Sequence, residues 1–147
     1  MVSVRGVAIS IGIVSLLSCG GEGIVGVLPE ASTPEGIQYE VHDTLYSRGD
    51  TVTLMLTNAT DRQLGYNLCV GDLELWDGKE WHRVRKMPEN SECIVPLHLL
   101  TPGDSARYLQ PVYDFIDVGI YRFRDSIEWF DDGGRVEIIS NGFRVTR

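Results

Sequence analysis

The sequence predicts an all-β protein whose main part folds as a single antiparallel β-sandwich of about seven to eight strands. Three observations predict it. Apolar and polar residues alternate with a period of two through most of the chain after residue 36, as in strands with one buried face. Turn residues recur roughly every 8 to 12 residues, the spacing typical of sandwiches. The length of 147 residues suits one hydrophobic core rather than two.

The first two strands are expected between residues 37 and 57. The segment "IQYEVHDTLY" alternates apolar and polar residues, and so does "TVTLMLT", with the turn "SRGD" between them. A turn in "TNATDRQ" then leads to "LGYNLC". The apolar side chains expected to face the core are Ile37, Tyr39 and Val41 in the first strand and Val52, Leu54 and Leu56 in the second.

A β-hairpin is predicted in "DLELWDGKEWHRV", with its turn at Asp77-Gly78. Glycine accepts the positive φ that tight hairpin turns require. The register stays open, because loops of two, three and four residues place Trp81 on different faces. Further along, "TPGDSARYLQ" predicts a Pro-Gly turn followed by a strand near residues 105–110.

The last strands are expected from residue 119 onward. In "GIYRFRDSIEWF" the apolar residues of one parity should face the core, while Arg122 and Arg124 should point to water. The turn "DDGG" leads into "RVEIISNGFRVT", where the apolar parity changes around Asn141-Gly142. Either a β-bulge resets the face there or a second hairpin begins. The inward set consists of Tyr121, Phe123, Ile127 and Trp129, and we expect it to meet the apolar face of residues 52–56 across the core.

The segments "TVTLMLTN", "LGYNLC", "LELWDGKEW", "LTPGDSARY" and "GIYRF" resemble the bacterial immunoglobulin-like domains of secreted proteins and lipoproteins. The resemblance covers about residues 37–145 and implies an immunoglobulin-like β-sandwich domain over residues 37–147. The chain departs from antibody-type domains in its cysteine spacing. The strand plan is also similar to that of a shorter, inhibitor-like domain found in some bacterial protease regulators.

Residues 1–18 have the features of an export signal. Arg5 precedes an apolar run over residues 7–17, which is too short to span a membrane. The run ends in "LLSC", which resembles the bacterial lipobox and implies a lipoprotein signal peptide over residues 1–18, cleavage before Cys19 and lipid attachment to Cys19. Several acyl chains then hold the protein stably on a membrane. The alternative is an ordinary signal with an incidental cysteine.

Gly20 follows Cys19, and in the lipoprotein family the absence of aspartate at this place favours the outer membrane, if the cell has two membranes. The expected location is therefore the cell envelope, with the membrane contacted through the lipid anchor. Residues 19–36 contain the lipidated cysteine and a stretch rich in Gly, Pro, Ser and Thr, which is typical of a flexible linker.

Two cysteines remain, Cys69 and Cys93. In an oxidising compartment outside the cytoplasm the simplest expectation is that they form a disulfide. A zinc site is the alternative, but neither cysteine has a second Cys or His at the spacing of two to four residues that zinc sites use.

The sequence offers little that predicts chemistry. His42, His82 and His98 have no metal-binding spacing, and no nucleophile or phosphate-binding motif occurs. We therefore expect no catalytic residue, no metal and no cofactor. Two acidic groups are expected to be solvated: residues 131–132 at a hairpin tip, rather than in a calcium loop, and Asp72, Glu74 and Asp77 along a hairpin face. The aromatic residues are expected mostly in the core, with a platform for sugars or peptides as the alternative.

Charge narrows the range of partners. The chain has 13 basic and 21 acidic residues, for a net charge of -8, and nucleic-acid binding needs clustered basic residues. The leading hypothesis is a non-enzymatic, lipid-anchored envelope protein that displays its domain for protein interaction or envelope architecture, with another envelope or extracellular protein as partner. The alternative is an inhibitor or regulator of an extracytoplasmic protease, acting through the loop at residues 86–96.

Overall fold

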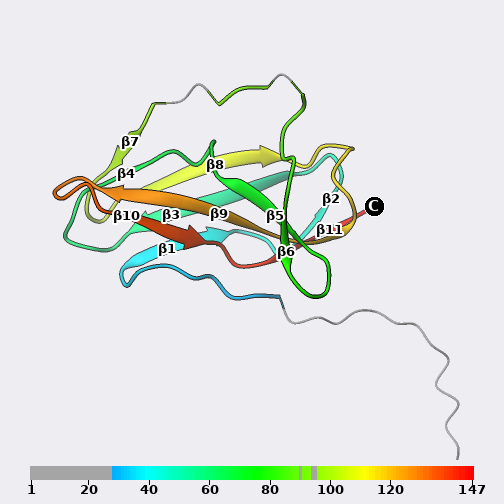
Figure 1. Ribbon diagram of the computed structural model, residues 1–147, viewed down its shortest axis with the longest axis horizontal. Helices are drawn as coiled ribbons and strands as arrows, with labels where there is room; N and C mark the ends of the chain where they lie inside the picture. The colour runs from blue at the N-terminus through cyan, green and yellow to red at the C-terminus, as the bar shows by residue number, and fades with distance from the viewer. Residues whose placement is uncertain (1–27, 90, 94–95) are drawn as a thin grey trace, which may run out of the picture.

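The computed structural model describes residues 28–89, 91–93 and 96–147. They form eleven β-strands in two sheets that pack face to face (Figure 1). The structure is therefore all-β and consistent with the predicted sandwich. The predicted signal peptide and Cys19 lie outside the described residues. Within the described part of the chain, no helix is long and apolar enough to cross a membrane.

The smaller sheet has three antiparallel strands in the order β1-β3-β8. They are β1 (Ile37–Val41), β3 (Thr51–Asn58) and β8 (Ser105–Pro111). Strand β3 pairs with β1 along one edge and with β8 along the other, and its buried residues alternate with half-exposed ones. This alternation is the pattern from which the strand was predicted.

The larger sheet is built around the 11-residue strand β9 (Gly119–Trp129). Along one edge of β9 lie β10 (Arg135–Ile139) and β11 (Phe143–Thr146), with β2 (Leu45–Ser47) parallel to β11. Along the other edge lie β4 (Leu64–Tyr66), with β7 (His98–Leu100) outside it, and β5 (Asp72–Trp76), with β6 (Trp81–Val84) outside it. The strands that pair with β9 are short, because each edge of β9 is shared by two strands with a break between them. These are β10 and β11 on one edge and β4 and β5 on the other.

One of these interruptions separates β10 from β11. Ile139 pairs with Arg124 and Phe143 pairs with Tyr121, so both strands follow β9 with a one-residue change of register. At the break Ser140 replaces the regular ladder. Its N–H donates to the Phe123 carbonyl, and its hydroxyl accepts from the Phe123 N–H, each at 2.9 Å. Of the two sequence alternatives at this place, the bulge is the one that forms.

The core lies between the two sheets and contains the residues that alternation predicted. Phe143 stacks on Phe123 and Tyr121, with ring centroids 5.5 and 5.9 Å apart. The apolar faces of β3 and β9 belong to the same buried cluster, as expected. The predicted core residues found buried are Ile37, Tyr39, Val41, Val52, Leu54, Leu56, Tyr121, Phe123, Ile127 and Trp129.

The predicted hairpin is β5–β6, and its register is now fixed. Trp76 pairs with Trp81, so residues 77–80 form the turn. Asp77 Oδ1 accepts from the N–H groups of Lys79 and Glu80, at 2.7 and 2.9 Å. Gly78 has a φ of 101°, which explains the need for glycine there. With this register both tryptophans lie on the outer face of the larger sheet.

Two expectations about exposure were wrong. Arg122 was expected to point to water, but only 14% of its side chain is exposed. Glu74 was expected on a solvated hairpin face, but only 9% of its side chain is exposed. The reason is that neighbouring strands bring these opposite charges side by side on the outer face, where their long side chains cover one another.

Part of the segment assigned to the linker lies along the larger sheet. Ser32 exchanges two backbone hydrogen bonds with Ile139, each 2.8 Å long, and the Pro29 carbonyl accepts from the N–H of Gly142. The ordered contacts of the domain therefore begin before residue 37.

Candidate functional site

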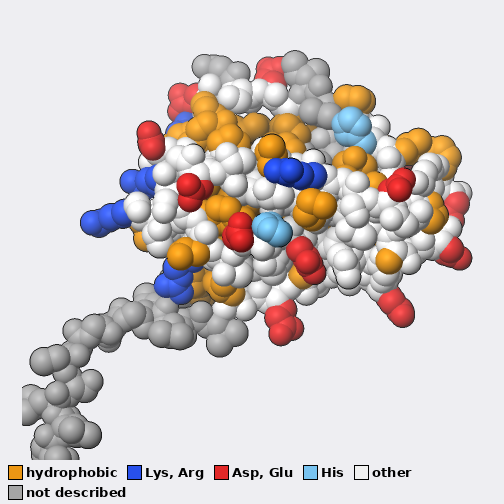
Figure 2. Space-filling model, turned by 180° about the vertical axis from the view of Figure 1, so that it is seen from behind, with side chains coloured by type: hydrophobic (Ala, Val, Ile, Leu, Met, Phe, Trp, Pro, Cys, Tyr) orange, Lys and Arg blue, Asp and Glu red, His pale blue; other side chains and the backbone are white. Residues whose placement is uncertain are grey.

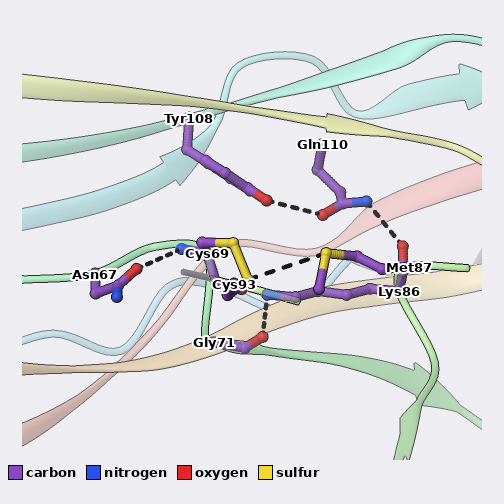
Figure 3. Close-up of a disulfide and its surroundings, with 8 residues drawn as sticks. All are labelled: Asn67, Cys69, Gly71, Lys86, Met87, Cys93, Tyr108 and Gln110. Carbon is purple, nitrogen blue, oxygen red and sulfur yellow. Dashed lines mark hydrogen bonds between the residues drawn. A yellow bond between two sulfur atoms is a disulfide. The ribbon is translucent and has the colours of Figure 1, made fainter. Parts of the chain in front are cut away.

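Cys69 and Cys93 form a disulfide, as predicted, with their Cα atoms 5.7 Å apart. The bond joins the β4–β5 connection to the β6–β7 connection (Figure 3). The Met87 sulfur lies 4.0 Å from the Cys93 sulfur, beside the bond. The disulfide therefore fastens the long loop after β6 to the larger sheet, and it does not link the two sheets.

Lys86 fastens the start of the same loop. Its side chain is buried and its ammonium group donates to the Gly71 carbonyl, while its own carbonyl accepts from Gln110 Nε2 at 2.9 Å (Figure 3). Gln110 comes from β8, so this bond reaches the smaller sheet. Burial lowers the pKa of Lys86 to about 8. The loop is thus held at Lys86 by polar contacts and at Cys93 by a covalent bond.

Asp125 lies in the core next to this region. It occupies an inward position of β9, and burial raises its pKa to about 6. Among the described residues, Asp125 Oδ2 and the Tyr39 hydroxyl are buried without a hydrogen-bond partner of good geometry. The Asp125 carboxylate packs against the backbone of Gly71, where any side chain would collide with it. The Gly71 backbone therefore separates two buried, oppositely charged groups, Lys86 and Asp125.

A pocket of about 580 Å³ opens beside the disulfide. It lies where β5 and β6 diverge, between their ends and the fastened loop. Its lining includes the two cysteines, Gly71 and Lys86. This pocket has room for a ligand and is the first of two candidate sites.

The second feature is a cluster of aromatic and charged side chains on the outer face of β5, β6 and β9, which we call the outer-face cluster. It comprises Glu74, Trp76, Trp81, Arg122 and Arg124. The rings of Trp76 and Trp81 have their centroids 5.3 Å apart, and the Arg122 guanidinium lies 4.1 Å from the Trp81 ring. The Glu74 carboxylate accepts from Nε of both Arg122 and Arg124, each at 2.7 Å.

The outer-face cluster differs from the opposite side of the domain. In Figure 2, which is turned by 180° from Figure 1, acidic side chains are scattered over the surface rather than gathered in one patch. In the cluster, by contrast, one buried carboxylate holds two arginines against a tryptophan pair. Neither tryptophan belongs to the buried core, so the expectation that the aromatic residues lie mostly in the core does not hold for these two.

His82 and the hairpin turn form one small polar group. His82 Nε2 lies 2.7 Å from Asp77 Oδ2, and Asp77, Glu80 and His82 bring possible metal-ligand atoms within 4.8 Å of one another. Backbone N–H groups of the turn are the main cause that lowers the pKa of Asp77 to about 2. The turn's own hydrogen bonds account for this arrangement. His42, which directly follows β1, and His98, on β7, are both exposed.

The predicted hairpin tip at residues 131–132 is exposed. Both carboxylates pair with Arg62, whose guanidinium also lies 4.4 Å from the Trp129 ring. The Asp131 and Asp132 side chains are 58% and 60% exposed. The tip is therefore exposed, as expected.

Sequence reasoning missed the buried charges. Asp125 carried a signal, because it stands at the same parity as Phe123 and Ile127 and so had to point inward. Glu74 stands opposite Arg122 in the pairing of β5 with β9, two strands that are far apart in the sequence. Lys86 carried no signal, since it lies in a loop whose path depends on the disulfide.

No protein-family model and no curated protein matches the chain. The outer-face cluster and the pocket beside the disulfide are the two candidate sites of the described domain.

Proposed function

We propose that the chain is a non-enzymatic, lipid-anchored protein of the cell envelope that displays an immunoglobulin-like domain for binding another protein. The observation that carries the proposal is the outer-face cluster. Tryptophan and arginine dominate the energetic centres of protein interfaces. Here two tryptophans and an arginine lie together outside the core, on the outer face of the larger sheet.

The cluster is also held in one arrangement before a partner arrives. Arg122 is fixed on one side by Glu74 and on the other by the Trp81 ring. A side chain that is already ordered loses less entropy on binding, which favours affinity. Arg124 also pairs with Glu137, so charged groups continue from the cluster along the outer face of the sheet, and polar rims are typical of interface centres.

Two features support the immunoglobulin-like part of the proposal. A three-stranded sheet faces a larger one centred on β9, and the Tyr121 hydroxyl at the start of β9 donates to the Asp117 carbonyl at 2.7 Å. A tyrosine bonded back to a residue shortly before its strand is a recurrent corner of immunoglobulin-like sandwiches. Phe123 stands two residues later, where antibody domains have a cysteine, and it packs on Phe143 instead.

Lipid anchoring rests on the lipobox-like "LLSC" at residues 16–19. Labelling of growing cells with a fatty-acid analogue should mark the wild-type chain, and Cys19→Ala should abolish the label and leave an uncleaved or soluble form. An unlabelled wild-type chain would refute this part of the proposal.

Binding through the outer-face cluster is tested in the native envelope with the anchored full chain. A photo-crosslinking amino acid replaces Trp81 in one sample and Arg107, exposed on β8 of the other sheet, in the control. We expect a discrete crosslinked protein from position 81 and none from position 107. The proposal fails if both positions give the same products or if position 81 gives none.

A second function is favoured by the fastening of the loop after β6. Inhibitors of proteases present rigid loops, and this loop is held at Lys86 and Cys93. A panel of extracytoplasmic proteases distinguishes it from simple display. The inhibitor function requires slowly reversible inhibition that is lost when exposed loop residues such as Glu89 and Glu92 are substituted.

A further inference from the structure

The pocket beside the disulfide has the size of a ligand site. Its volume of about 580 Å³ lies within the range of roughly 300–1,000 Å³ found for small-molecule pockets. Its walls are mainly apolar and come from both sides of the fork between β5 and β6. The apolar residues are Val70, Leu73, Val84, Met87 and Pro88.

The charges of this pocket oppose those of the whole chain. Arg83, Arg85 and Lys86 line it together with a single carboxylate, that of Asp72. The chain as a whole carries a net charge of -8. Three cationic groups around apolar walls therefore complement an anion that has an apolar body.

Lys86 is the cation best placed to need such an anion. Only 8% of the residue is exposed, and its ammonium, which has three N–H groups, donates to the Gly71 carbonyl. Asp125 and Asp72 act on it from a distance, but no carboxylate in the described part of the chain forms an ion pair with it. A buried cation without a paired anion is costly, and a ligand carboxylate offsets that cost.

The two arginines are available at the rim. Arg83 pairs with Asp72 and Arg85 with Glu89, each at 2.8 Å, and their side chains are 75% and 49% exposed. Exposed ion pairs of this kind contribute little free energy. They can be exchanged for contacts to a ligand at small cost.

We propose that this pocket binds a ligand that carries a carboxylate on a short apolar chain, with Lys86 as the partner of the carboxylate. The apolar chain lies along Met87 and Val70, and Arg83 and Arg85 close the entrance. A free fatty acid and the C-terminal end of an apolar peptide share this chemistry. The inference concerns a different surface from the outer-face cluster and does not depend on the proposed function.

Proton uptake follows from the proposal as a separate signature. The burial of Lys86 lowers the pKa of its amine to about 8, so part of the protein is unprotonated just above that pH. A bound carboxylate favours the ammonium form and raises the pKa again. Binding should therefore take up protons between about pH 8 and 9.

Calorimetric titration of the mature, disulfide-bonded domain tests the proposal with two matched pairs of probes. Octanoate is compared with octanol, and N-acetyl-dileucine with its C-terminal amide. We expect at least one acid to bind about tenfold or more tightly than its neutral partner, as a charge-assisted contact provides. The pair that shows the preference identifies the source of the ligand, lipid or peptide.

Variants assign the preference to Lys86. Lys86→Met should abolish it, Lys86→Arg should keep most of it, and Lys79→Met, at an exposed lysine in the β5–β6 turn, should leave it unchanged. Because Lys86→Met also removes the bond to Gly71, its thermal unfolding is measured first. If it does not fold, proton uptake by the wild-type protein, taken from binding heats in two buffers, decides.

Three results would overturn the proposal. The first is equal binding of acid and neutral probes, and the second is an acid preference that survives in Lys86→Met. The third is failure of both acids to bind the wild-type domain at about 10 mM, where even weak pocket ligands are detected.

Discussion

Replacement of Asp125 by asparagine should change how the stability of the domain depends on pH. Asp125 is buried in β9, and burial raises its pKa from 3.8 to about 6. The groups around it come from several elements: Tyr39 on β1, Asp72 on β5, Lys86 in the fastened loop and Tyr108 on β8. Lys86 remains charged throughout acidic pH and partly offsets the effect of burial.

The direction follows from the raised pKa of Asp125. Below about pH 4 the carboxyl group is protonated in both the folded and the unfolded chain, and its contribution to stability is fully present. As the pH rises, the unfolded chain ionises first, so this contribution is lost progressively until about pH 6. A pKa difference of about two corresponds to about 3 kcal/mol. Between about pH 4 and pH 7 the free energy of unfolding of Asp125→Asn should therefore rise by about 3 kcal/mol relative to that of the wild type.

Urea unfolding followed by tryptophan fluorescence measures this difference at several pH values. Other carboxylates contribute equally to both proteins, so the difference between them isolates Asp125. A difference that stays constant from about pH 4 to pH 7 would refute the reasoning. In a Lys86→Met background, the pH range of the change should move upward, because the charge of Lys86 lowers the pKa of Asp125.

Three further substitutions test the fold. Phe123→Ala should cost about 3–5 kcal/mol in urea unfolding, because the ring is almost fully buried; a loss below about 1 kcal/mol would contradict the core assignment. Tyr121→Phe should cost about 1 kcal/mol through loss of its bond to the Asp117 carbonyl, and an unchanged unfolding midpoint would show that the corner contributes nothing. Cys69→Ser should cost about 3 kcal/mol by opening a loop with a sequence separation of 24; two alkylatable thiols in the native wild-type protein would contradict the disulfide itself.

Alternation was sufficient to predict which side chains form the core. In β3 and β9 one face is buried along the whole strand, so a period of two in the sequence is a direct record of burial. Phe123 and Leu54 could be assigned in this way without knowing which strands pair. The short strands β2, β4 and β7 could not, because three residues are too few to show a period.

The interruptions of the larger sheet depend on individual side chains. The bulge between β10 and β11 forms because the Ser140 hydroxyl takes the place of a backbone acceptor for Phe123. Asn141 then bonds the backbone of Val41 in both directions, at 2.7 and 3.2 Å. The sequence showed a change of parity there, but both a bulge and a hairpin produce such a change. A bulge and a hairpin are distinguished here only by the fact that both β10 and β11 pair with β9.

The candidate sites were hard to predict because they depend on contacts between distant segments. The outer-face cluster requires two registers: the hairpin loop length places Trp81 beside Trp76, and the pairing of β5 with the distant strand β9 places Glu74 beside Arg122. The pocket requires the disulfide, whose pairing was predictable because only two cysteines remained for an oxidising compartment. Its consequence was not predictable, since nothing in a loop sequence shows that Lys86 reaches Gly71. Two of the three buried charged residues of the described domain, Asp125 and Lys86, therefore lie in the region that the disulfide fastens, and the third, Glu74, lies in the outer-face cluster.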